Sequence, residues 1–432
     1  MALPSFRLIH VYLRFLIPRV WEVLCDKVRA WVHRLTYRAI EPCQNVVVIG
    51  GSFGGIELTR KLAQSLPTGY RVVLLEKNSH FNYPFNFPRY SVLQGHEHLS
   101  FIPYDGVVKG TPKGIYSFVR GEAATITDQA VHLKSGKTIP YTYVVIATGA
   151  TQRPPARVIA SDKTEAQAEL RSTQGAIKAA SKVAVIGAGA VGVELAADIK
   201  GYYPDKLVTL IHSRGTLLPR FPGVHRHVLA ALQALGVDVL LGERPQLPST
   251  KDNFEDELEQ DKRQTISFSD GRSIDYDLII PCTGQSPNSG LLQDIEPDAI
   301  SNSTGRILTQ PTLQVSSKSG HATRLFAFGD VAETGGALMA RSAWYQAQIV
   351  RQNILDLIKG KKPTATYLPN LEVEGALKLT LGKSDWIMYV KPKNGDAVIS
   401  SYSNGNEDLD VYSAWNYYGA DVSSVDNETR DD

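Results

Sequence analysis

The chain has 432 residues, of which 43% are hydrophobic, so it can form several domains with buried cores and is not a disordered polypeptide. Its formal net charge of +2 gives no reason to expect nucleic acid as a partner, because that inference needs a strongly basic face. Cys25, Cys43 and Cys282 are too few and too scattered for a disulfide framework, and we therefore expect a reducing compartment.

Residues 1–40 form a basic arm, in which seven Lys and Arg residues stand against Glu22 and Asp26. Apolar residues such as Leu13, Trp31 and Leu35 recur between them at helical spacing, but charges interrupt them too often for a membrane span. Three interpretations stay open: an interfacial amphipathic anchor, which we favour, a mitochondrial presequence, or a helix packed on the body of the protein. We expect a membrane-associated protein on the cytosolic side, or a mitochondrial one, and not a secreted one.

The first glycine-rich turn follows a strand predicted over residues 45–49 and precedes a helical pattern; it reads Gly50-Gly51-Ser52-Phe53-Gly54-Gly55. In a dinucleotide-binding unit such glycines permit a tight bend, close approach of the backbone to a pyrophosphate, and close packing of helix on strand. Ser52 stands where the second of these glycines is expected. A strand over residues 70–75 then ends at Glu76, about twenty residues on, where an acid can accept hydrogen bonds from a ribose.

The second glycine-rich turn follows a strand predicted over residues 182–186 and reads Gly187-Ala188-Gly189-Ala190-Val191-Gly192. The next strand, over residues 207–211, ends in His212-Ser213-Arg214 and has no acid there. Because an arginine can pair with a 2′-phosphate, this unit favours NADP(H) or accepts both nicotinamide cofactors; alternatively, Arg214 is a solvated loop residue. Two turns of this kind indicate two dinucleotides.

Three further strands are predicted to end in turn signals. The strands over residues 143–146 and 276–280 close on Ala147-Thr148-Gly149 and Cys282-Thr283-Gly284, and the strand over residues 324–328 closes on Gly329-Asp330, followed by a helical pattern over residues 337–359. Residues 376–381 and 386–390 are β-like, with Asn394-Gly395 as a hairpin signal. The acid-rich segment 251–262 is typical of a solvated insertion loop.

These residues resemble the two-dinucleotide-binding flavoprotein superfamily, which is pyridine nucleotide-disulfide oxidoreductase-like. Within it they resemble the apoptosis-inducing-factor-like group, in its AMID or ferroptosis-suppressor branch. The likeness runs from residue 45 to residue 415. Its branch-level matches are Phe53-Gly54-Gly55, residues 88–92, residues 192–197, residues 208–213 and Ser413-Ala414-Trp415.

The resemblance implies an α/β fold with two Rossmann-like dinucleotide-binding domains, the FAD domain being split around the NAD(P)H domain, and a small C-terminal α/β interface domain. The expected boundaries are 1–40 for the basic arm, 41–155 and 281–365 for the FAD domain, 156–280 for the NAD(P)H domain, 366–420 for the C-terminal domain and 421–432 for a disordered acidic tail.

The resemblance also implies FAD and NAD(P)H as cofactors. Glu194 would lie near the nicotinamide and isoalloxazine, Asp330 would hydrogen-bond the ribityl chain, and Arg89 and Met339 would border the flavin. Glu194 and Arg89 are the candidate catalytic residues; for Glu194 the alternative is a solvated carboxylate at a helix start. The candidate cofactor-binding residues are Gly50, Gly51, Ser52, Gly54, Gly55, Glu76, Arg89, Thr148, Gly149, Gly187, Gly189, Gly192, Glu194, His212, Arg214, Gly284, Gly329, Asp330 and Met339.

One departure from the superfamily bears on the chemistry. Its disulfide reductases carry a redox cysteine pair beside the flavin, whereas residues 77–94 contain no cysteine. We therefore expect hydride transfer from the nicotinamide to the flavin, followed by direct transfer of electrons to a small acceptor. No metal site is expected, because the pairs His96/His98 and His225/His227 have no supporting ligand cluster.

The aromatic segment 80–88, together with Trp344 and Tyr345, suits a flat apolar acceptor, although such rings could equally pack a core. With the membrane-seeking arm, we favour a lipid-soluble quinone. Two alternatives stay open: a signalling flavoprotein with little turnover, and a flavin oxidoreductase that tailors an aromatic metabolite. Nothing in the sequence indicates the oligomeric state.

Overall fold

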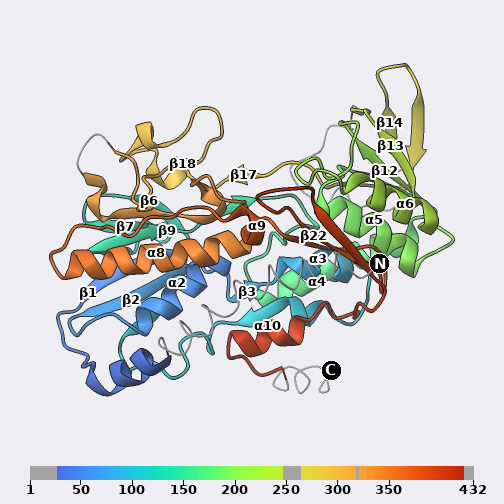
Figure 1. Ribbon diagram of the computed structural model, residues 1–432. Helices are drawn as coiled ribbons and strands as arrows, with labels where there is room; N and C mark the ends of the chain where they lie inside the picture. Colours follow the sequence, from blue (N-terminus) through green and yellow to red (C-terminus); the bar gives the residue numbers. More distant parts are fainter. Residues whose placement is uncertain (1–26, 247–263, 318–320, 423–432) are drawn as a thin grey trace. The chain divides into compact units, whose positions relative to one another are not determined.

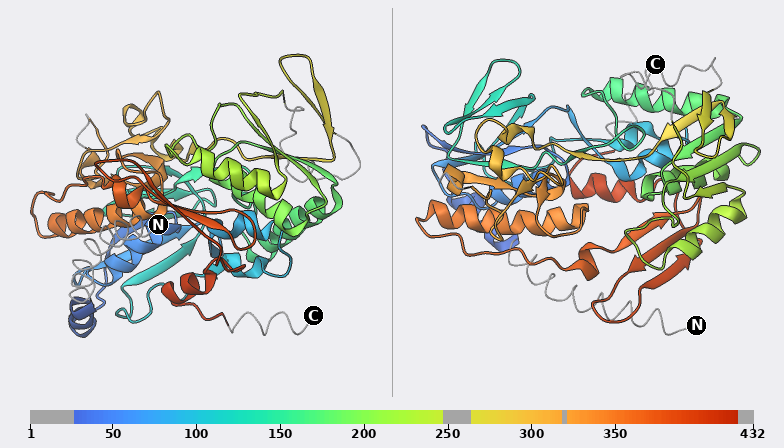
Figure 2. Two further views of the ribbon diagram at one scale, coloured as in Figure 1. Left: turned by 45° about the vertical axis from the view of Figure 1, so that its right-hand side comes forward. Right: turned by 90° about the horizontal axis from the view of Figure 1, so that it is seen from above.

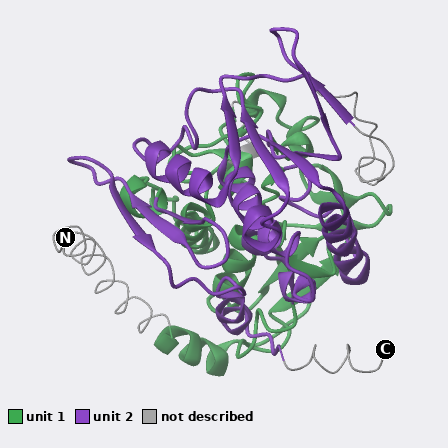
Figure 3. Ribbon diagram, turned by 90° about the vertical axis from the view of Figure 1, so that its right-hand side faces the viewer, with its two compact units in different colours: residues 1–81, 103–151, 286–375 green, residues 82–102, 152–285, 376–432 purple. Residues whose placement is uncertain are grey.

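The computed structural model describes residues 27–246, 264–317 and 321–422. The predictions for residues 1–26, for the insertion loop 251–262 and for residues 423–432 of the tail lie outside the described residues. The chain divides into two compact units, coloured separately in Figure 3. Unit 1 comprises residues 1–81, 103–151 and 286–375, and unit 2 comprises residues 82–102, 152–285 and 376–432.

Unit 1 is built on a five-stranded parallel sheet (Figure 1). Its strands, in spatial order, are β19 (Leu325–Ala327), β9 (Tyr143–Ile146), β1 (Gln44–Ile49), β2 (Tyr70–Glu76) and β5 (Tyr116–Arg120). The middle strands are almost entirely apolar and buried, as expected for a parallel sheet that is covered on both faces.

Two helices of unit 1, α2 (Phe53–Ala63) and α8 (Ala340–Ile358), lie against each other (Figure 1). Gly54 allows this approach, because a Cβ there would lie 2.6 Å from the Phe328 ring and 3.1 Å from Ala343 Cβ. The other elements of unit 1 are β6 (Ala123–Ile126), β7 (Ala130–Leu133), β8 (Thr138–Pro140), β10 (Ala150–Thr151), β17 (Ser286–Pro287), β18 (Ile307–Leu308), β20 (Ala332–Glu333) and α9 (Leu371–Glu374).

Unit 2 contains a second parallel sheet, with strands in the order β13 (Asp238–Leu241), β12 (Leu207–His212), β11 (Lys182–Ile186) and β16 (Leu278–Pro281). Its helices include α3 (Phe87–Tyr90), α4 (Lys163–Ala179), α5 (Ala190–Tyr202) and α6 (His225–Leu235). A hairpin of β14 (Gln264–Ser267) and β15 (Ser273–Tyr276) precedes β16. The short strands β3 (His80–Asn82) and β4 (Phe101–Pro103) stand where the chain passes between the units.

The C-terminal residues form an antiparallel sheet that belongs to unit 2 and is drawn in orange and red in Figure 2. It consists of β21 (Leu377–Thr380), β22 (Trp386–Val390) and β23 (Val398–Tyr402), and the helix α10 (Val411–Tyr417) follows. Gly395 has a φ of +93°, which suits the predicted hairpin turn. Trp415 is completely buried and its indole N–H donates to the Leu99 carbonyl at 2.9 Å, which fixes α10 within this unit.

The predicted α/β class with parallel sheets is confirmed, and the predicted strands coincide with β1, β2, β9, β11 and β12 to within one residue at each end. The strand predicted over residues 276–280 is wrong in one respect, because Tyr276 ends β15 and Leu278 begins β16. Between them, the Asp277 carboxylate accepts from the backbone N–H groups of Ser181 and Lys182 at 2.9 and 2.8 Å. The chain therefore bends at Asp277 within a mostly apolar run for which the sequence pattern predicts a single strand.

Candidate cofactor and active site

The predicted FAD-binding residues of unit 1 gather at the carboxyl ends of its parallel strands. Ile49 pairs with Leu75 on one side and with Ile146 on the other, and Ala327 pairs with Ile146. The residues that follow these four are Gly50, Glu76, Ala147 and Phe328. Since ligands of open α/β sheets bind at this edge, the strand register by itself brings the candidate residues together.

The first glycine turn has the geometry of a nucleotide cradle. Gly50 has a φ of +100°, and a Cβ on Gly55 would lie 1.8 Å from the Gly50 carbonyl oxygen, so both positions require glycine. A Cβ on Gly51 would lie 2.6 Å from the Tyr104 hydroxyl, which donates to the Gly51 carbonyl at 2.8 Å. Ser52 is the N-cap of α2, yet its hydroxyl accepts no hydrogen bond from the helix. The N–H groups of the first turn of α2 therefore stay without a side-chain cap, as an incoming pyrophosphate requires.

Glu76 is buried at the end of β2, where it faces the glycine turn. One carboxylate oxygen accepts from the Gly51 N–H at 2.5 Å, and the other accepts from the backbone and side chain of Asn78 at 2.9 and 2.8 Å. Each carboxylate oxygen has two lone pairs, so one acceptor site remains, on the oxygen that faces Gly51, for a ribose hydroxyl. Glu76 thus fits the adenosine end of FAD.

The later FAD candidates have well-defined surroundings. Thr148 donates its hydroxyl to the Asn288 carbonyl at 2.8 Å, and Gly149 has a φ of +64° with no atom within 4 Å of an added Cβ. Gly329 has a φ of +76° and donates its N–H to the Gln346 side chain at 2.8 Å. Asp330 lies in the same turn, and Met339 is the N-cap of α8. Their contacts with the flavin stay a prediction.

The second glycine turn repeats the first. Gly187 has a φ of +111°, and a Cβ on Gly192 would lie 1.9 Å from the Gly187 carbonyl oxygen. Gly189 is the N-cap of α5, and no atom lies within 4 Å of an added Cβ there. This open space beside an uncapped helix N-terminus fits a second pyrophosphate.

His212 supplies an independent sign of a missing ligand in unit 2. Its Nδ1 accepts from the Ala188 N–H at 3.2 Å, so in the neutral ring Nε2 carries the proton. That Nε2 is buried and has no hydrogen-bond partner among the described residues. Burial lowers the pKa of His212, and the neighbouring Arg214 charge lowers it further, which keeps the ring neutral. Arg214 itself is exposed, and Gly284 follows β16 at the same edge of the sheet with a φ of +75°.

Glu194 lies in the second turn of α5. Its Oε1 accepts from the Thr380 N–H at 3.1 Å and from the Thr380 hydroxyl at 3.2 Å. Burial raises the pKa of Glu194 to about 7, and the Asp198 carboxylate raises it as well, while the Thr380 hydrogen bonds and Arg89 oppose the rise. The alternative of a solvated carboxylate at a helix start does not describe this half-buried, hydrogen-bonded group.

Arg89 is also in unit 2, on α3, and only 1% of its side chain is exposed. Its Nε–H donates to Asp198 at 2.8 Å, and its two terminal nitrogens donate to the Gly382 carbonyl at 2.7 Å and the Lys383 carbonyl at 3.3 Å. These three bonds account for its burial. The predicted contact of Arg89 with the flavin stays a prediction.

Several residues of these sites were not found by sequence reasoning: Asn78, Tyr104, Asn288 and Gln346 in unit 1, and Asp198 and Thr380 in unit 2. Tyr104, Asn288 and Thr380 lie 53, 140 and 186 positions along the chain from the groups that they contact, and Asp198 lies 109 positions from Arg89, so no local pattern marks these pairs. Asp198 did leave a signal of its own, since it is an acid one helical turn after Glu194 in the mostly apolar helix α5.

Residues 44–348 match the family described as pyridine nucleotide-disulphide oxidoreductase. The chain belongs to this family. It is 34% identical over 362 residues to Fe-regulated protein 8 of Mycosarcoma maydis, and the match covers 78% of this chain and 87% of that protein. It is 30% identical over 354 residues to ferroptosis suppressor protein 1 of Homo sapiens, with 79% and 87% covered. The resemblance to the ferroptosis-suppressor branch is thereby confirmed.

The fold is also that of a solved structure, the sulfide:quinone oxidoreductase of Aquifex aeolicus, with a TM-score of 0.66 at 16% identity, over 87% of this chain and 90% of that one. Together with the two nucleotide cradles, the family establishes the coarse activity: the protein is an NAD(P)H-dependent FAD oxidoreductase. What accepts the electrons, and where, is a separate question.

Proposed function

We propose that this oxidoreductase passes electrons from NAD(P)H through FAD to a quinone at a membrane surface. The observation that carries the proposal is a helix over residues 27–36 that is fixed to unit 1 and presents an apolar and basic face outward. A fixed helix of this kind would hold the FAD-binding unit at a lipid surface, where a lipid-soluble acceptor is concentrated.

Two side chains fix this helix to unit 1. His33 Nε2 lies 2.7 Å from the Leu66 carbonyl oxygen, and the Tyr37 hydroxyl donates to the Tyr70 carbonyl at 3.0 Å. Tyr37 is only 5% exposed, and burial raises its pKa to about 12, so it stays neutral at any physiological pH. The packed-helix interpretation therefore applies to one face of residues 27–37, and it leaves the opposite face to be explained.

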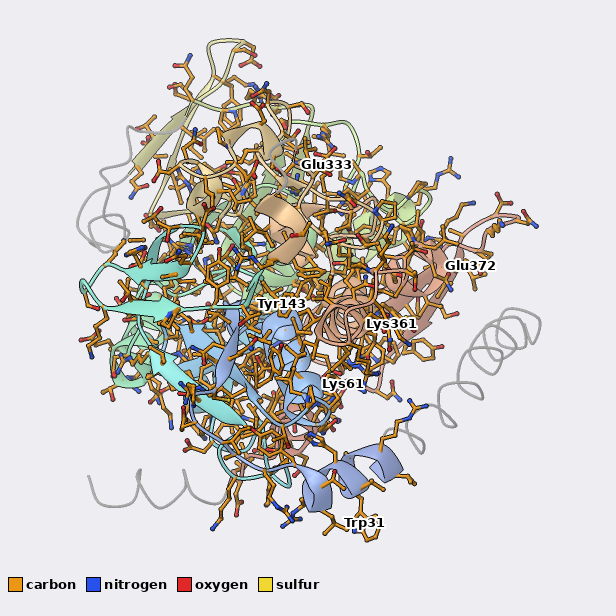
Figure 4. The ribbon with its side chains drawn as sticks, turned by 90° about the vertical axis from the view of Figure 1, so that its left-hand side faces the viewer. Trp31, Lys61, Tyr143, Glu333, Lys361 and Glu372 are labelled. Atoms are coloured by element: carbon orange, nitrogen blue, oxygen red, sulfur yellow. The ribbon has the colours of Figure 1, made fainter. Side chains whose placement is uncertain are left out.

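The outward face combines large apolar side chains with cations. Figure 4 shows Trp31 pointing away from the rest of unit 1. Trp31 is 65% exposed, and Val28, Val32, Leu35 and Ile40 are also exposed. The exposed cations are Lys27, Arg29, Arg34 and Arg38. Tryptophan and leucine beside Lys and Arg are typical of a helix lying in the interface of an anionic membrane.

Across residues 27–246, 264–317 and 321–422, no helix has the length and hydropathy that crossing a bilayer requires. A peripheral attachment needs only one apolar face and a few cations.

The chemistry also favours a small acceptor over a thiol. When bound, NAD(P)H supplies a hydride and FAD relays its two electrons one or two at a time. The described cysteines, Cys43 and Cys282, are free and belong to different units, and burial raises the pKa of Cys282 to about 12, which keeps it an inert thiol. The described part of the chain therefore offers no cysteine pair to relay electrons.

The aromatic residues support the acceptor assignment only in part. Phe81 and Phe87 are completely buried, where Phe81 meets Phe53 edge to face at 5.1 Å and Phe87 packs on Phe101 at 5.9 Å. These rings fill cores, as the alternative interpretation held. Trp344 and Tyr345 on α8 are half-buried and remain candidates for an acceptor wall.

A liposome assay tests the proposal. The triple variant Val28→Ser, Trp31→Ser, Leu35→Ser removes apolar side chains from the outward face and leaves His33 and Tyr37 in place. We expect it to keep its flavin spectrum and its reduction by NAD(P)H, but to lose at least tenfold in binding to anionic liposomes and in reduction of a long-chain quinone dissolved in them. Fully burying one such side chain contributes about 1.5–3 kcal/mol.

The matched control is Leu207→Ser, which removes an apolar side chain that is 64% exposed on unit 2. It should bind liposomes as the wild type does. Equal liposome binding by the triple variant and the wild type would reject the membrane part of the proposal. Oxidation of NAD(P)H without any quinone dependence would reject the acceptor.

A further inference from the structure

Two acidic side chains on one face of α5, together with an arginine, form a cluster inside unit 2. Glu194 and Asp198 are four residues apart, so they are neighbours one helical turn apart. Asp198 is completely buried, and its ion pair with Arg89 has an Nε···Oδ1 distance of 2.8 Å. Buried charges are costly unless paired, so a pair at this position calls for an explanation.

The Arg89 guanidinium connects three parts of unit 2. It bonds to Asp198 on α5 and to the carbonyl groups of Gly382 and Lys383, which directly follow the strand that carries Thr380. Thr380 in turn holds the Glu194 carboxylate through two hydrogen bonds. Glu194 is therefore held from one side by its own helix and from the other by a segment that Arg89 fixes to that helix.

The backbones of these segments pass beside each other. A Cβ on Gly201 of α5 would lie 3.4 Å from the Lys383 nitrogen, and one on Gly382 would lie 3.5 Å from the Ala197 carbonyl oxygen. Gly382 also has a φ of +88°, which favours glycine. The 380–383 segment thus lies in van der Waals contact with α5, and Arg89 is bonded to both.

We propose that Arg89 and Asp198 are positioning residues for Glu194: the pair fixes the 380–383 segment against α5 and sets the charge that the Glu194 carboxyl experiences. The inference rests on the proposed function and on the expectation from the family resemblance that Glu194 lies near the nicotinamide. It gives Arg89 a role that acts through Glu194 instead of through the flavin.

The charged and titratable groups around the cluster allow the sign of each effect to be assigned. Asp198 disfavours the ionised form of Glu194, whereas Arg89 and the Thr380 donors favour it. Asp198 Oδ2 has no hydrogen-bond partner among the described residues, so only Arg89 compensates its charge. Farther out, the Tyr202 ring lies 5.7 Å from the Arg89 guanidinium and 4.8 Å from the Lys383 ammonium, and its hydroxyl donates to Glu407 at 2.9 Å.

The test compares two substitutions that flank the same carboxyl. The pH titration of the Glu194 carboxyl is followed by its infrared C=O band in the FAD-loaded protein without NAD(P)H, and Glu194→Gln assigns the band by removing it. Asp198→Asn keeps an acceptor for Arg89 but removes the negative charge, and should lower the titration midpoint by about one pH unit or more. Thr380→Val removes the hydroxyl donor and should raise the midpoint.

Opposite shifts in these two variants would support the inference, and unchanged midpoints or shifts in the same direction would overturn it. This readout needs no turnover, so it is separable from the proposed function. The infrared midpoints could move as expected while the visible flavin spectrum shows no change as Glu194 titrates. In that case the positioning role stands and the placement of Glu194 beside the reacting rings fails.

A second comparison addresses Arg89 itself. Arg89→Met should slow flavin reduction by NAD(P)H at least tenfold in the folded, FAD-loaded fraction, and Arg89→Lys, which keeps the charge facing Asp198, should restore most of the rate. Arg89→Lys could reduce its flavin as slowly as Arg89→Met does, although the pH midpoint of Glu194 in Arg89→Lys equals that of the wild type. In that case the charge at position 89 is irrelevant to flavin reduction and the inference fails.

Discussion

The buried Arg89–Asp198 ion pair and the exposed Lys134–Glu122 pair have nearly equal N···O distances, 2.8 and 2.7 Å, but opposite surroundings. The side chains of the first pair are 1% and 0% exposed, and those of the second are 63% and 49% exposed. Removing one partner of a buried pair leaves an uncompensated charge, whereas an exposed charge is simply hydrated. Burial, and not distance, therefore decides what each pair contributes.

Arg89→Met should lower the free energy of unfolding by about 3–5 kcal/mol, because Asp198 then stays buried without its cation. Lys134→Met is the control and should change it by less than about 1 kcal/mol. Urea unfolding of the FAD-loaded protein measures both. Similar small losses in the two variants would contradict the view that Asp198 depends on Arg89.

Arg214→Ala should raise the KM for NADPH more than the KM for NADH. A charge-assisted hydrogen bond contributes about 1.5–3 kcal/mol, which corresponds to roughly tenfold or more in affinity. Arg214 lies near enough to His212 for its charge to lower the pKa of that ring. Arg220→Ala, in the same loop, is the matched control; equal effects of Arg214→Ala on both cofactors would remove the proposed preference.

Residues that contact their neighbours along the chain were predictable, and residues that act across it were not. The glycine turns, Glu76 and Asp330 follow strands and belong to spaced motifs. Thr380 reaches Glu194 over 186 positions, and Tyr104 reaches Gly51 over 53, so only the folded chain reveals these pairs. The partners of Arg89 could not be predicted for the same reason, since they lie 109 and 293 positions away.

At the scale of elements, helix α5 combines the N-terminus of a nucleotide cradle with two carboxyls whose pKa is raised. Burial raises the pKa of Glu194 from its ordinary 4.5 to about 7, and it raises that of Asp198 from 3.8 to about 6 against the opposing effect of Arg89. Both groups therefore bind protons more tightly in the folded protein than in the unfolded one. Their contribution to stability is complete below the ordinary pKa values and is lost as the pH rises through the folded ones.

The double variant Glu194→Gln, Asp198→Asn should consequently show a flatter dependence of unfolding free energy on pH between about pH 4 and pH 7. Chemical denaturation at several pH values measures this slope. Glu97→Gln is a control of opposite sign: burial raises the pKa of Glu97, but its backbone hydrogen bond, Gln174 and Arg171 lower it overall. That variant should lose stability mainly above pH 4.5, and an unchanged slope in the double variant would contradict the assignment for α5.

Strand prediction succeeded because apolar runs of four to seven residues in a parallel sheet differ clearly from their polar flanks. It failed at Asp277, where a bend separates the buried end of β15 from the buried strand β16 within one mostly apolar run. The start of α8 was predicted three residues too early, because Ala337 and Leu338 are apolar but the chain bends there, with the Met339 N–H donating to the Ala337 carbonyl at 2.9 Å. The hydrophobic pattern of a sequence shows which residues are buried. It shows less well where the chain changes direction.

At the scale of the whole molecule, the two cradles belong to different units and can be disabled separately. Gly55→Ala should give a colourless protein, since its Cβ would lie 1.8 Å from the Gly50 carbonyl oxygen. Gly192→Ala, with 1.9 Å to the Gly187 carbonyl oxygen, should keep the yellow FAD but lose most of its reduction by NAD(P)H. Flavin absorbance before and after addition of NAD(P)H measures both effects.

Gly175→Ala in α4 is the control for these substitutions, because no atom lies within 4 Å of an added Cβ there and alanine is the better helix former. It should behave as the wild type in both assays. A Gly192→Ala variant that is bleached by NAD(P)H at the normal rate would show that the second turn does not bind the nicotinamide cofactor.

The order of the strands along the chain has a consequence for synthesis. The outermost strand of the first sheet, β19, pairs with β9, yet about 180 residues lie between them and include all four strands of the second sheet. On a ribosome, domains fold as they emerge, so the second sheet can form completely while the first sheet still lacks its edge strand β19. Until residue 327 has been made, one side of β9 is unpaired, so the nascent chain carries an open strand edge. Binding of a chaperone, or early binding of FAD, would protect this edge from pairing with another chain.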